Sequence, residues 1–256
     1  MCLSLSGSDP DVRPAISVVI PVHNEADNIG ALLAEIHAAL ASCGDHEVVV
    51  VDDGSTDGTL ACLTAALHPP ARSLHILSHA IRSGQSAALR SGILAARGEW
   101  IVTLDGDGQN DPADIPGLLA LTKTATPPTL ICGQRQRRQD SWPRRFSSRV
   151  ANTVRSRLLD DGVMDTGCGL KVFRRDDFLR LPWFDHMHRF LPALFRREGG
   201  TVVTREVHHR PRRRGQSKYG VHNRFWVGIV DLCGVLWLKR RGRIVQVRTI
   251  PERRTP

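Results

Sequence analysis

The chain lacks the cysteine spacing of a zinc-binding module and the N-terminal signal peptide of a secreted protein. Its six cysteines are scattered, with no C-x-x-C pair and no histidine partners at zinc-finger spacing: Cys2, Cys43, Cys62, Cys132, Cys168 and Cys233. Such usage argues against structural zinc and indicates a reducing compartment. Residues 1–14 lack the basic and apolar regions of a signal peptide. We therefore expect a disordered tail over 1–14 and a cytoplasmic location.

The sequence also lacks an internal repeat, a low-complexity tract and an apolar run long enough to cross a bilayer. The run at 225–238 is interrupted by Asp231, and it is shorter than the about 20 residues that a spanning helix needs. Hydrophobic residues make up 41% of the 256 residues, which is enough to bury one large core. We expect one domain over 15–222, followed by a basic C-terminal segment over 223–256.

Charge is divided unevenly along the chain. Residues 1–133 carry 6 Lys and Arg against 15 Asp and Glu, whereas residues 134–256 carry 29 against 11. The basic half is expected to face an anionic partner: nucleic acid, an anionic lipid surface or a phosphorylated substrate. The alternative is a solvated basic surface.

Apolar runs and helical patterns alternate along the first 104 residues. Short β-branched runs predict strands at 16–22, 47–51, 74–77 and 101–104, and apolar residues at helical spacing predict helices at 29–40, 60–67 and 87–96. Asp57 is placed to cap the second helix. Strict alternation predicts an α/β fold with a mostly parallel sheet and helices on both faces.

The stretch from Trp100 to Pro112, W-I-V-T-L-D-G-D-G-Q-N-D-P, ends a predicted buried strand in two carboxylates, Asp105 and Asp107. Ligands of open α/β sheets bind at the carboxyl ends of the strands. Two carboxylates one residue apart suit a hard divalent cation and the phosphates that it bridges. The alternative is an acidic turn, because D-x-D alone is common.

Several motifs in fixed order resemble those of the family 2 glycosyltransferases with the GT-A fold, which is Rossmann-like. They are P-V-H-N-E at 21–25, V-D-D-G-S-T-D-G-T at 51–59, R-S-G-Q-S-A-A-L at 82–89 and L-D-G-D-G-Q at 104–109. Blocks at 165–175, 188–194 and 212–219 resemble the polyprenyl-phosphate glycosyltransferases of the dolichol-phosphate mannosyltransferase type. The resemblance covers roughly 15–240 and implies a nucleotide-sugar half at 15–109 and an acceptor half at 110–222.

The resemblance also implies which residues bind the nucleotide-sugar donor. They are Pro21, His23, Glu25, Asp53, Arg82, Gly84 and Asp105, with Arg212, Ser217 and Lys218 in a loop that folds over the diphosphate. His23 stands where the family often has tyrosine, which weakens the expectation of base stacking. Asp53 can instead stabilise a turn beside Gly54, and Arg82 can be an ordinary surface charge.

The catalytic residues implied are Asp105, Asp107 and Arg135. Asp105 and Asp107, with Gln109 as a further oxygen ligand, would hold Mg²⁺ or Mn²⁺, a Lewis acid for the departing diphosphate. Arg135, in G-Q-R where the family has G-S-R, would bind the acceptor phosphate together with Arg144 and Ser148. A block containing Asp165, Thr166 and Lys171 would close the site, with Cys168 packed inside rather than acting as a nucleophile.

The implied reaction is direct displacement, in which an acceptor phosphate oxygen attacks the anomeric carbon with inversion. The E-D motif that supplies a base for hydroxyl acceptors is absent from 160–175, and a phosphate is already anionic at neutral pH. Transfer to a polysaccharide or glycolipid hydroxyl remains the alternative. A nucleic-acid-binding protein using R-R-R-G at 212–215 would leave the acidic motifs unexplained, so we expect no nucleic-acid partner.

The C-terminal apolar run predicts an amphipathic helix. Phe225, Trp226, Ile229, Leu232, Leu236 and Trp237 recur at helical spacing, and Lys239, Arg240, Arg241 and Arg243 follow. Such a helix can lie in a membrane interface, which predicts a peripheral protein on the cytoplasmic face. It can equally close the domain's own core, or contact a membrane-protein partner or a second copy of the chain. We assign no chemistry to His186, His188, His208 or His209.

Overall fold

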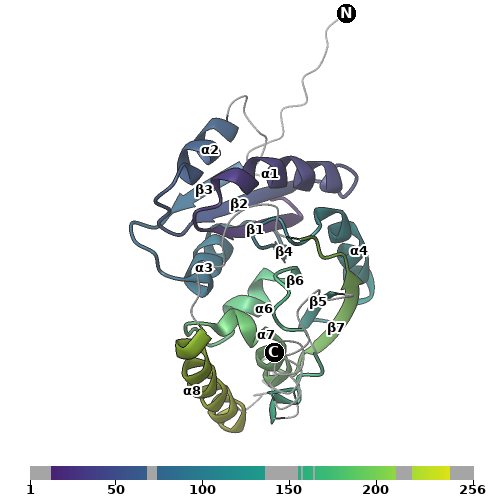
Figure 1. The fold of residues 1–256 in the computed structure, drawn as a ribbon. Coiled ribbons are helices and arrows are strands. Elements are labelled where there is room, and N and C mark those ends of the chain that lie inside the picture. Colours follow the sequence, from purple (N-terminus) through teal and green to yellow (C-terminus); the bar gives the residue numbers. More distant parts are fainter. Residues whose placement is uncertain are drawn as a thin grey trace, which may run out of the picture.

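The structure is a computed structural model that describes residues 13–67, 74–135, 155–156, 158–163, 165–211 and 221–242, with only the backbone for 221–226 (Figure 1). These residues form one sheet in the order β3-β2-β1-β4-β6-β5-β7. The strands are β1 (Ile16–Val22), β2 (His46–Asp52), β3 (Leu74–Ser78), β4 (Trp100–Thr103), β5 (Thr129–Arg135), β6 (Lys171–Arg174) and β7 (Thr201–Val207). All neighbouring strands pair in parallel except where β6 meets β4 and β5.

Helices cover both faces of this sheet (Figure 1). One face packs on α1 (Ala26–Leu40), α2 (Thr59–Ala66) and α4 (Ile115–Ala120). The other packs on α3 (Gln85–Ala95), α6 (Arg175–Leu179), α7 (Leu191–Arg197) and α8 (Val221–Arg241). Short 3₁₀ turns lie at Pro112–Asp114, Leu121–Thr124 and Met187–Arg189. The predicted α/β architecture with a mostly parallel sheet is confirmed.

The valine run of β2 shows why this sheet is buried on both sides. Val48 and Val50 pack into the core under α1 and α2, and Val49 and Val51 pack into the core under α3. Successive side chains of a strand point to opposite faces, so only a strand covered on both sides takes an uninterrupted apolar run.

The sequence patterns predicted none of strands β5, β6 and β7, and β6 is the one of the three that shapes the site. It lies antiparallel between β4 and β5, with Thr103 opposite Lys171. An antiparallel strand begins beside the end of its neighbour. The loop before β6, at 165–170, is therefore delivered to the carboxyl end of β4.

The start of α2 differs by one residue from the prediction that Asp57 is its N-cap. Gly58 occupies the cap position and the helix begins at Thr59. Asp57 Oδ1 still accepts the Thr59 N–H, at 2.9 Å. Its Oδ2 accepts the N–H of Ala26, at 3.4 Å, so Asp57 also reaches the first turn of α1. Asp57 therefore binds backbone N–H groups at the starts of two helices, which explains why it lies one residue before the cap position of α2.

Helix α8 packs one side against the domain. Val235 is fully buried, and Leu232, Leu236 and Leu238 lie against the core beneath α7. Arg197 Nε donates to the Leu238 carbonyl at 3.1 Å. The predicted apolar face is thus divided, because Leu232 and Leu236 pack inward while Ile229 and Trp237 are 37% and 60% exposed. The side chains of Phe225 and Trp226 lie outside the described residues.

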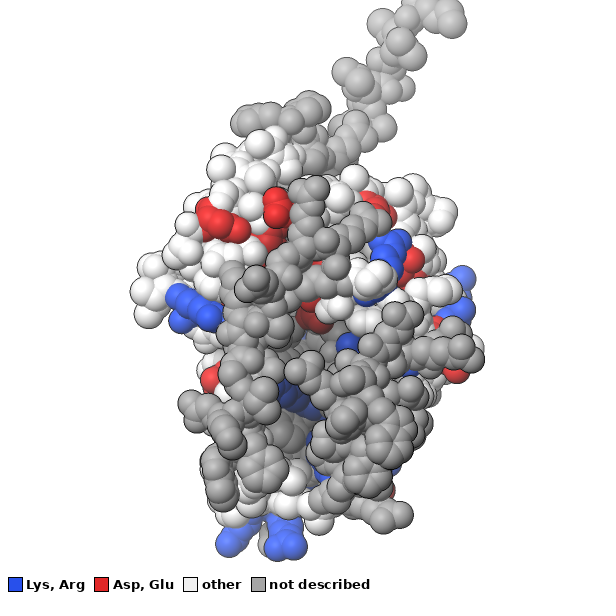
Figure 2. Space-filling view, viewed as in Figure 1, with Lys and Arg blue, Asp and Glu red and all other residues white. Residues whose placement is uncertain are grey.

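No helix among the described residues is long and apolar enough to cross a membrane. Of the predicted tail, residues 1–12 lie outside the described part of the chain, and Pro14 is buried. Figure 2 shows acidic side chains mainly in the upper part of the molecule, whereas basic side chains lie on both flanks, near the centre and at the bottom.

Candidate active site at the carboxyl edge of the sheet

The order of the strands brings three turns that carry acidic and other polar side chains to one edge of the sheet. The chain runs outward from β1 to β2 and β3, then returns so that β4 lies on the other side of β1. A reversal of this kind creates a crevice outside the carboxyl ends of the strands, where ligands of open α/β sheets bind. The turns at this edge are 23–25 after β1, 53–58 after β2 and 105–109 after β4.

Asp105 and Asp107 form the acidic centre of this edge. Gln85 Nε2, at the start of α3, donates to Asp105 Oδ1 at 2.8 Å, and Asp107 Oδ1 accepts the Gln109 N–H at 3.1 Å. Burial, and then the negative charge of Asp107, raises the pKa of Asp105 to about 6, against the opposing charges of Lys171 and Arg135. A divalent cation would relieve this repulsion, so the pair fits a hard metal ion.

The rest of a metal shell must come from other oxygen atoms. No group of three or more His, Cys, Asp or Glu side chains suited to a cation occurs within the described residues. The amide oxygen of Gln109 and phosphate oxygens of a ligand are chemically suitable.

Two glycines make room for the acidic pair. A Cβ at Gly169 would lie 2.3 Å from Asp105 Cγ, and a Cβ at Gly106 would lie 2.5 Å from Val22 Cγ1. Thr103 Oγ1 donates to the Gly169 carbonyl at 2.7 Å. The loop before β6 is thereby pressed against Asp105 at a position where no side chain fits.

The turn after β1 is fastened to the turn after β2. His23 Nδ1 lies 2.9 Å from the Asp53 carbonyl oxygen, which can only accept, so Nδ1 carries a hydrogen. The Asn24 N–H donates to Ser55 Oγ and the Glu25 N–H to Thr59 Oγ1, each at 2.8 Å. His23 and Glu25, which are predicted to bind the nucleotide-sugar donor, are therefore held against residues 53–59, and Pro21 lies near the end of β1.

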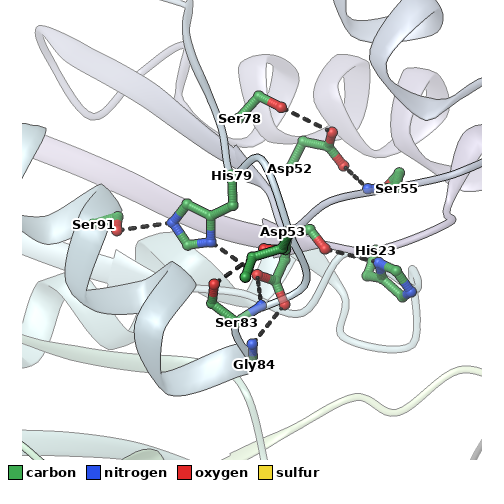
Figure 3. A network of polar contacts seen from close by, with 10 residues as sticks. His23, Asp52, Asp53, Ser55, Ser78, His79, Ser83, Gly84 and Ser91 are labelled. Carbon is green, nitrogen blue, oxygen red and sulfur yellow. Dashed lines mark hydrogen bonds and ion pairs between the residues drawn. The ribbon is translucent and has the colours of Figure 1, made fainter.

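Asp53 is occupied by the protein itself (Figure 3). Its Oδ1 accepts from the Ser83 N–H at 2.7 Å and from His79 Nδ1 at 2.8 Å, and its Oδ2 accepts from the Gly84 N–H at 2.8 Å. A carboxylate has about four acceptor positions, so these bonds use three of them. Burial raises the pKa of Asp53, but these three hydrogen bonds outweigh it and leave the pKa lowered. Its predicted contact with base or ribose remains a prediction.

The turn containing Arg82 and Gly84 packs on the turn after β2. Gly54 and Gly84 have φ of +64° and +94°, which glycine adopts without strain. A Cβ at Gly54 would lie 2.7 Å from the Arg82 nitrogen. Arg82 itself is exposed, so its side chain lies at the surface, next to the turn after β2.

Arg135, which is predicted to bind the acceptor phosphate, is paired with Asp165. Nε and Nη2 of Arg135 donate to the two oxygens of Asp165, at 2.6 and 2.7 Å. The two side chains are only 12% and 13% exposed. Burial lowers the pKa of Arg135, but the hydrogen bond and charge of Asp165 leave it raised. The pair takes two of the five guanidinium N–H donors.

Buried Lys171 fixes the loop that carries Asp165. Its Nζ donates to the Thr166 carbonyl at 3.4 Å and to the Cys168 carbonyl. Cys168 is 1% exposed and accepts from Asn110 Nδ2 at 3.4 Å. Burial raises the pKa of the Cys168 thiol. These facts confirm that Cys168 is packed, and a protonated buried thiol is a poor nucleophile.

Five residues predicted to bind the substrates lie outside the described residues: Arg144, Ser148, Arg212, Ser217 and Lys218.

The histidines without assigned chemistry contact other side chains. His186 Nδ1 lies 3.1 Å from Asp231, His188 Nδ1 lies 2.7 Å from Ser86 Oγ, and His208 Nδ1 lies 2.9 Å from Asp114. Sequence reasoning missed Gln85, His79 and Gly169. Gln85 and Gly169 carried a signal, because they lie in the family-like blocks at 82–89 and 165–175, whereas His79 lies in no such block.

Comparison with known proteins agrees with this arrangement. Residues 17–181 match the model of glycosyl transferase family 2. The chain is 34% identical to dodecaprenyl-phosphate galacturonate synthase of Rhizobium johnstonii, over 91% of this chain and 70% of that protein. It is 36% identical to undecaprenyl-phosphate 4-deoxy-4-formamido-L-arabinose transferase of Edwardsiella ictaluri, over 80% of this chain and 63% of that protein. It thus spans between three fifths and three quarters of these relatives.

Solved structures share the fold. A mannosyltransferase from Pyrobaculum calidifontis, in complex with GDP-Man and Mn²⁺, gives a TM-score of 0.62 at 24% identity, over 93% of this chain and 68% of that one. Glucosyl-3-phosphoglycerate synthase from Mycobacterium tuberculosis, with Mn²⁺ and UDP-glucose, gives 0.63 at 20% identity, over 86% and 79%. The similarity confirms the GT-A architecture predicted from the motifs.

Proposed function

The chain belongs to glycosyl transferase family 2 and is a glycosyltransferase, and on that premise we propose that it transfers a sugar from a nucleotide sugar to a polyprenyl phosphate. The observation that carries the proposal is a site combining an acidic pair with buried Arg135, in a chain similar to two enzymes named for polyprenyl-phosphate transfer. The donor in this proposal is GDP-mannose or a UDP-sugar.

On the donor side, Asp105 and Asp107, with Gln109, would hold Mg²⁺ or Mn²⁺. Bound there, the cation supplies Lewis-acid stabilisation of the charge on the leaving diphosphate. The turn of Pro21, His23 and Glu25 would lie along the nucleotide. Both solved relatives described above contain Mn²⁺, which supports a divalent metal.

On the acceptor side, the guanidinium of Arg135 would orient the phosphate, with Arg144 and Ser148 as further contacts. A phosphate oxygen attacks the anomeric carbon, the bond to the nucleoside diphosphate breaks, and the configuration inverts. The attacking oxygen is already anionic, so the reaction needs no strong general base. The absence of an E-D motif from 160–175 supports this acceptor over a hydroxyl group.

The decisive experiment is a panel of UDP- and GDP-sugars incubated with undecaprenyl phosphate and Mn²⁺ or Mg²⁺. We expect a phosphate-linked glycolipid with one donor, formation of which stops when the metal is chelated. Transfer to polysaccharide or glycolipid hydroxyls, with none to polyprenyl phosphate, would overturn the proposed acceptor. Salt-sensitive DNA retention without turnover of any nucleotide sugar would instead favour nucleic-acid binding.

Replacing Arg135 with Ala is predicted to affect use of the acceptor selectively. Loss of a charge-assisted contact should raise the KM for polyprenyl phosphate about tenfold or more, while the donor KM stays within about twofold. The free energy of unfolding should fall by about 3 kcal/mol, because Asp165 loses its bidentate partner. Arg174→Ala removes a more exposed pair with Glu99 and is the matched control. An unchanged acceptor KM would contradict the assignment.

We further propose peripheral attachment to the cytoplasmic face of the membrane through α8. A long-chain acceptor keeps its phosphate at the bilayer surface, so the enzyme must reach it there. Val230 and Trp237 are 69% and 60% exposed on α8, and the exposed residues Arg240 and Arg241 lie in its last turn, near Trp237. Exposed apolar side chains next to cationic ones suit the interface of anionic lipid.

Sedimentation with vesicles of anionic phospholipid tests this attachment. The full chain should sediment at low salt and be released by high salt or mild detergent. Because Val235 is part of the core, point variants are cleaner than deletion of the helix. Replacing Val230 and Trp237 with Ser should weaken binding about tenfold or more, whereas Leu60→Ser on α2, at a residue 42% exposed, should not. Equal sedimentation of the two variants would exclude α8 as the anchor.

A further inference from the structure

A chain of hydrogen bonds runs from the middle of α3 to the end of β2 (Figure 3). His79, just after β3, bonds through Nδ1 to Asp53 Oδ1 at 2.8 Å and through Nε2 to Ser91 Oγ at 2.9 Å. The His79 side chain is 18% exposed and that of Asp53 is 6% exposed. An ionised carboxylate only accepts, so His79 Nδ1 carries a hydrogen.

Serine, histidine and aspartate linked in this order have the connectivity of a hydrolytic triad, and the surroundings argue against that chemistry. Ser91 lies inside α3, where backbone N–H groups bond to carbonyls four residues earlier. They are therefore not available as donors to an oxyanion. Asp53 also accepts two backbone N–H groups, from Ser83 and Gly84. The hydrogen bonds of Ser91, His79 and Asp53 therefore hold the turn at 83–84 in place.

The fastened turn leads directly to the candidate metal site. Ser83 and Gly84 are held by Asp53, and the next residue, Gln85, donates to Asp105 Oδ1 at 2.8 Å. These hydrogen bonds, together with the backbone at 83–85, therefore connect the end of β2 to the end of β4, which lie on the two sides of β1. His79 touches neither the predicted donor residues' turn at 23–25 nor the acidic pair in any described contact.

We propose that His79 is a positioning residue, which holds Asp53 so that the 83–84 backbone sets Gln85 against Asp105 and so prepares the site for a divalent cation and a nucleotide. The proposal rests on the part of the proposed function that concerns binding of the nucleotide-sugar donor. It gives His79 no role in binding the acceptor.

The test is direct binding of Mn²⁺ with UDP or GDP, measured by calorimetry on the full chain without acceptor. In His79→Phe, the dissociation constant should rise about tenfold, the effect of losing a buried hydrogen bond to a charged group. His79→Asn places a side-chain N–H near the position of Nδ1 and should recover most of the affinity. In turnover assays the donor KM should rise while kcat stays within about twofold.

The matched control is His75→Phe, which removes a histidine–carboxylate contact from the opposite end of β3. His75 Nε2 lies 3.4 Å from Glu47. Its nucleotide affinity should match the wild type, and thermal unfolding should show all three variants folded. Wild-type affinity in His79→Phe, or equal losses in His79→Asn and His79→Phe, would overturn the proposal. A wild type that binds Mn²⁺ and nucleotide but transfers nothing to polyprenyl phosphate would overturn the proposed acceptor alone.

Discussion

Asp107→Asn is expected to abolish metal-dependent turnover while leaving the fold intact. The substitution preserves the shape of the side chain but removes one of the two charges at the end of β4. A hard cation binds an amide oxygen more weakly than a carboxylate. Loss of several kcal/mol of transition-state stabilisation corresponds to a fall of about 10³-fold in kcat/KM. Kinetics over a range of Mn²⁺ concentrations, with circular dichroism for the fold, provide the measurement.

Asp176→Asn is the control for this charge change. Asp176 is the second residue of α6, and its side chain is 74% exposed and lies 4.0 Å from that of Arg175. Its neutralisation should leave kcat/KM within about twofold, as is usual for a surface substitution. Wild-type turnover by Asp107→Asn, at any metal concentration, would remove Asp107 from the metal site.

Gly169→Ala is expected to reduce turnover about 100-fold by displacing Asp105. The new Cβ would lie 2.3 Å from Cγ and Oδ2 of that carboxylate, and its nearest neighbours are all atoms of Asp105. The short Asp105 side chain can rotate away, so the loss of stability should be modest. Rotation nevertheless breaks its bond to Gln85 and separates it from Asp107. A displacement of about 1 Å at a reacting centre can cost two orders of magnitude in rate.

Gly169→Ala is expected to lower metal binding and activity with little effect on stability. Mn²⁺ affinity measured by electron paramagnetic resonance should fall together with kcat/KM, while the melting temperature changes little. Gly30→Ala, on the open side of α1 with no heavy atom near the new Cβ, should leave metal binding unchanged and stabilise the helix. Unaltered Mn²⁺ binding in Gly169→Ala would mean that Asp105 is not a metal ligand.

The sequence by itself determined the alternation of strands and helices and the carboxylates at the strand ends. These features depend on local patterns: β-branched runs such as 48–51, apolar spacing in α1, and acidic residues beside glycine where a strand stops. Parallel strands bring their carboxyl ends to one edge. The meeting of the turns after β1, β2 and β4 therefore followed from the pattern, and the structure places them together.

Only the tertiary structure decided how these residues are used. Asp53 and His79 are 26 residues apart, Arg135 and Asp165 are 30 apart, and Gln85 and Asp105 are 20 apart. The insertion of β6 brings Gly169 against Asp105, and the packing of Val235 turns half of α8 inward. No short-range pattern encodes these contacts, because they depend on which strand pairs with which and which face of a helix finds a core. The donors that surround each carboxylate are fixed only when the sheet is assembled.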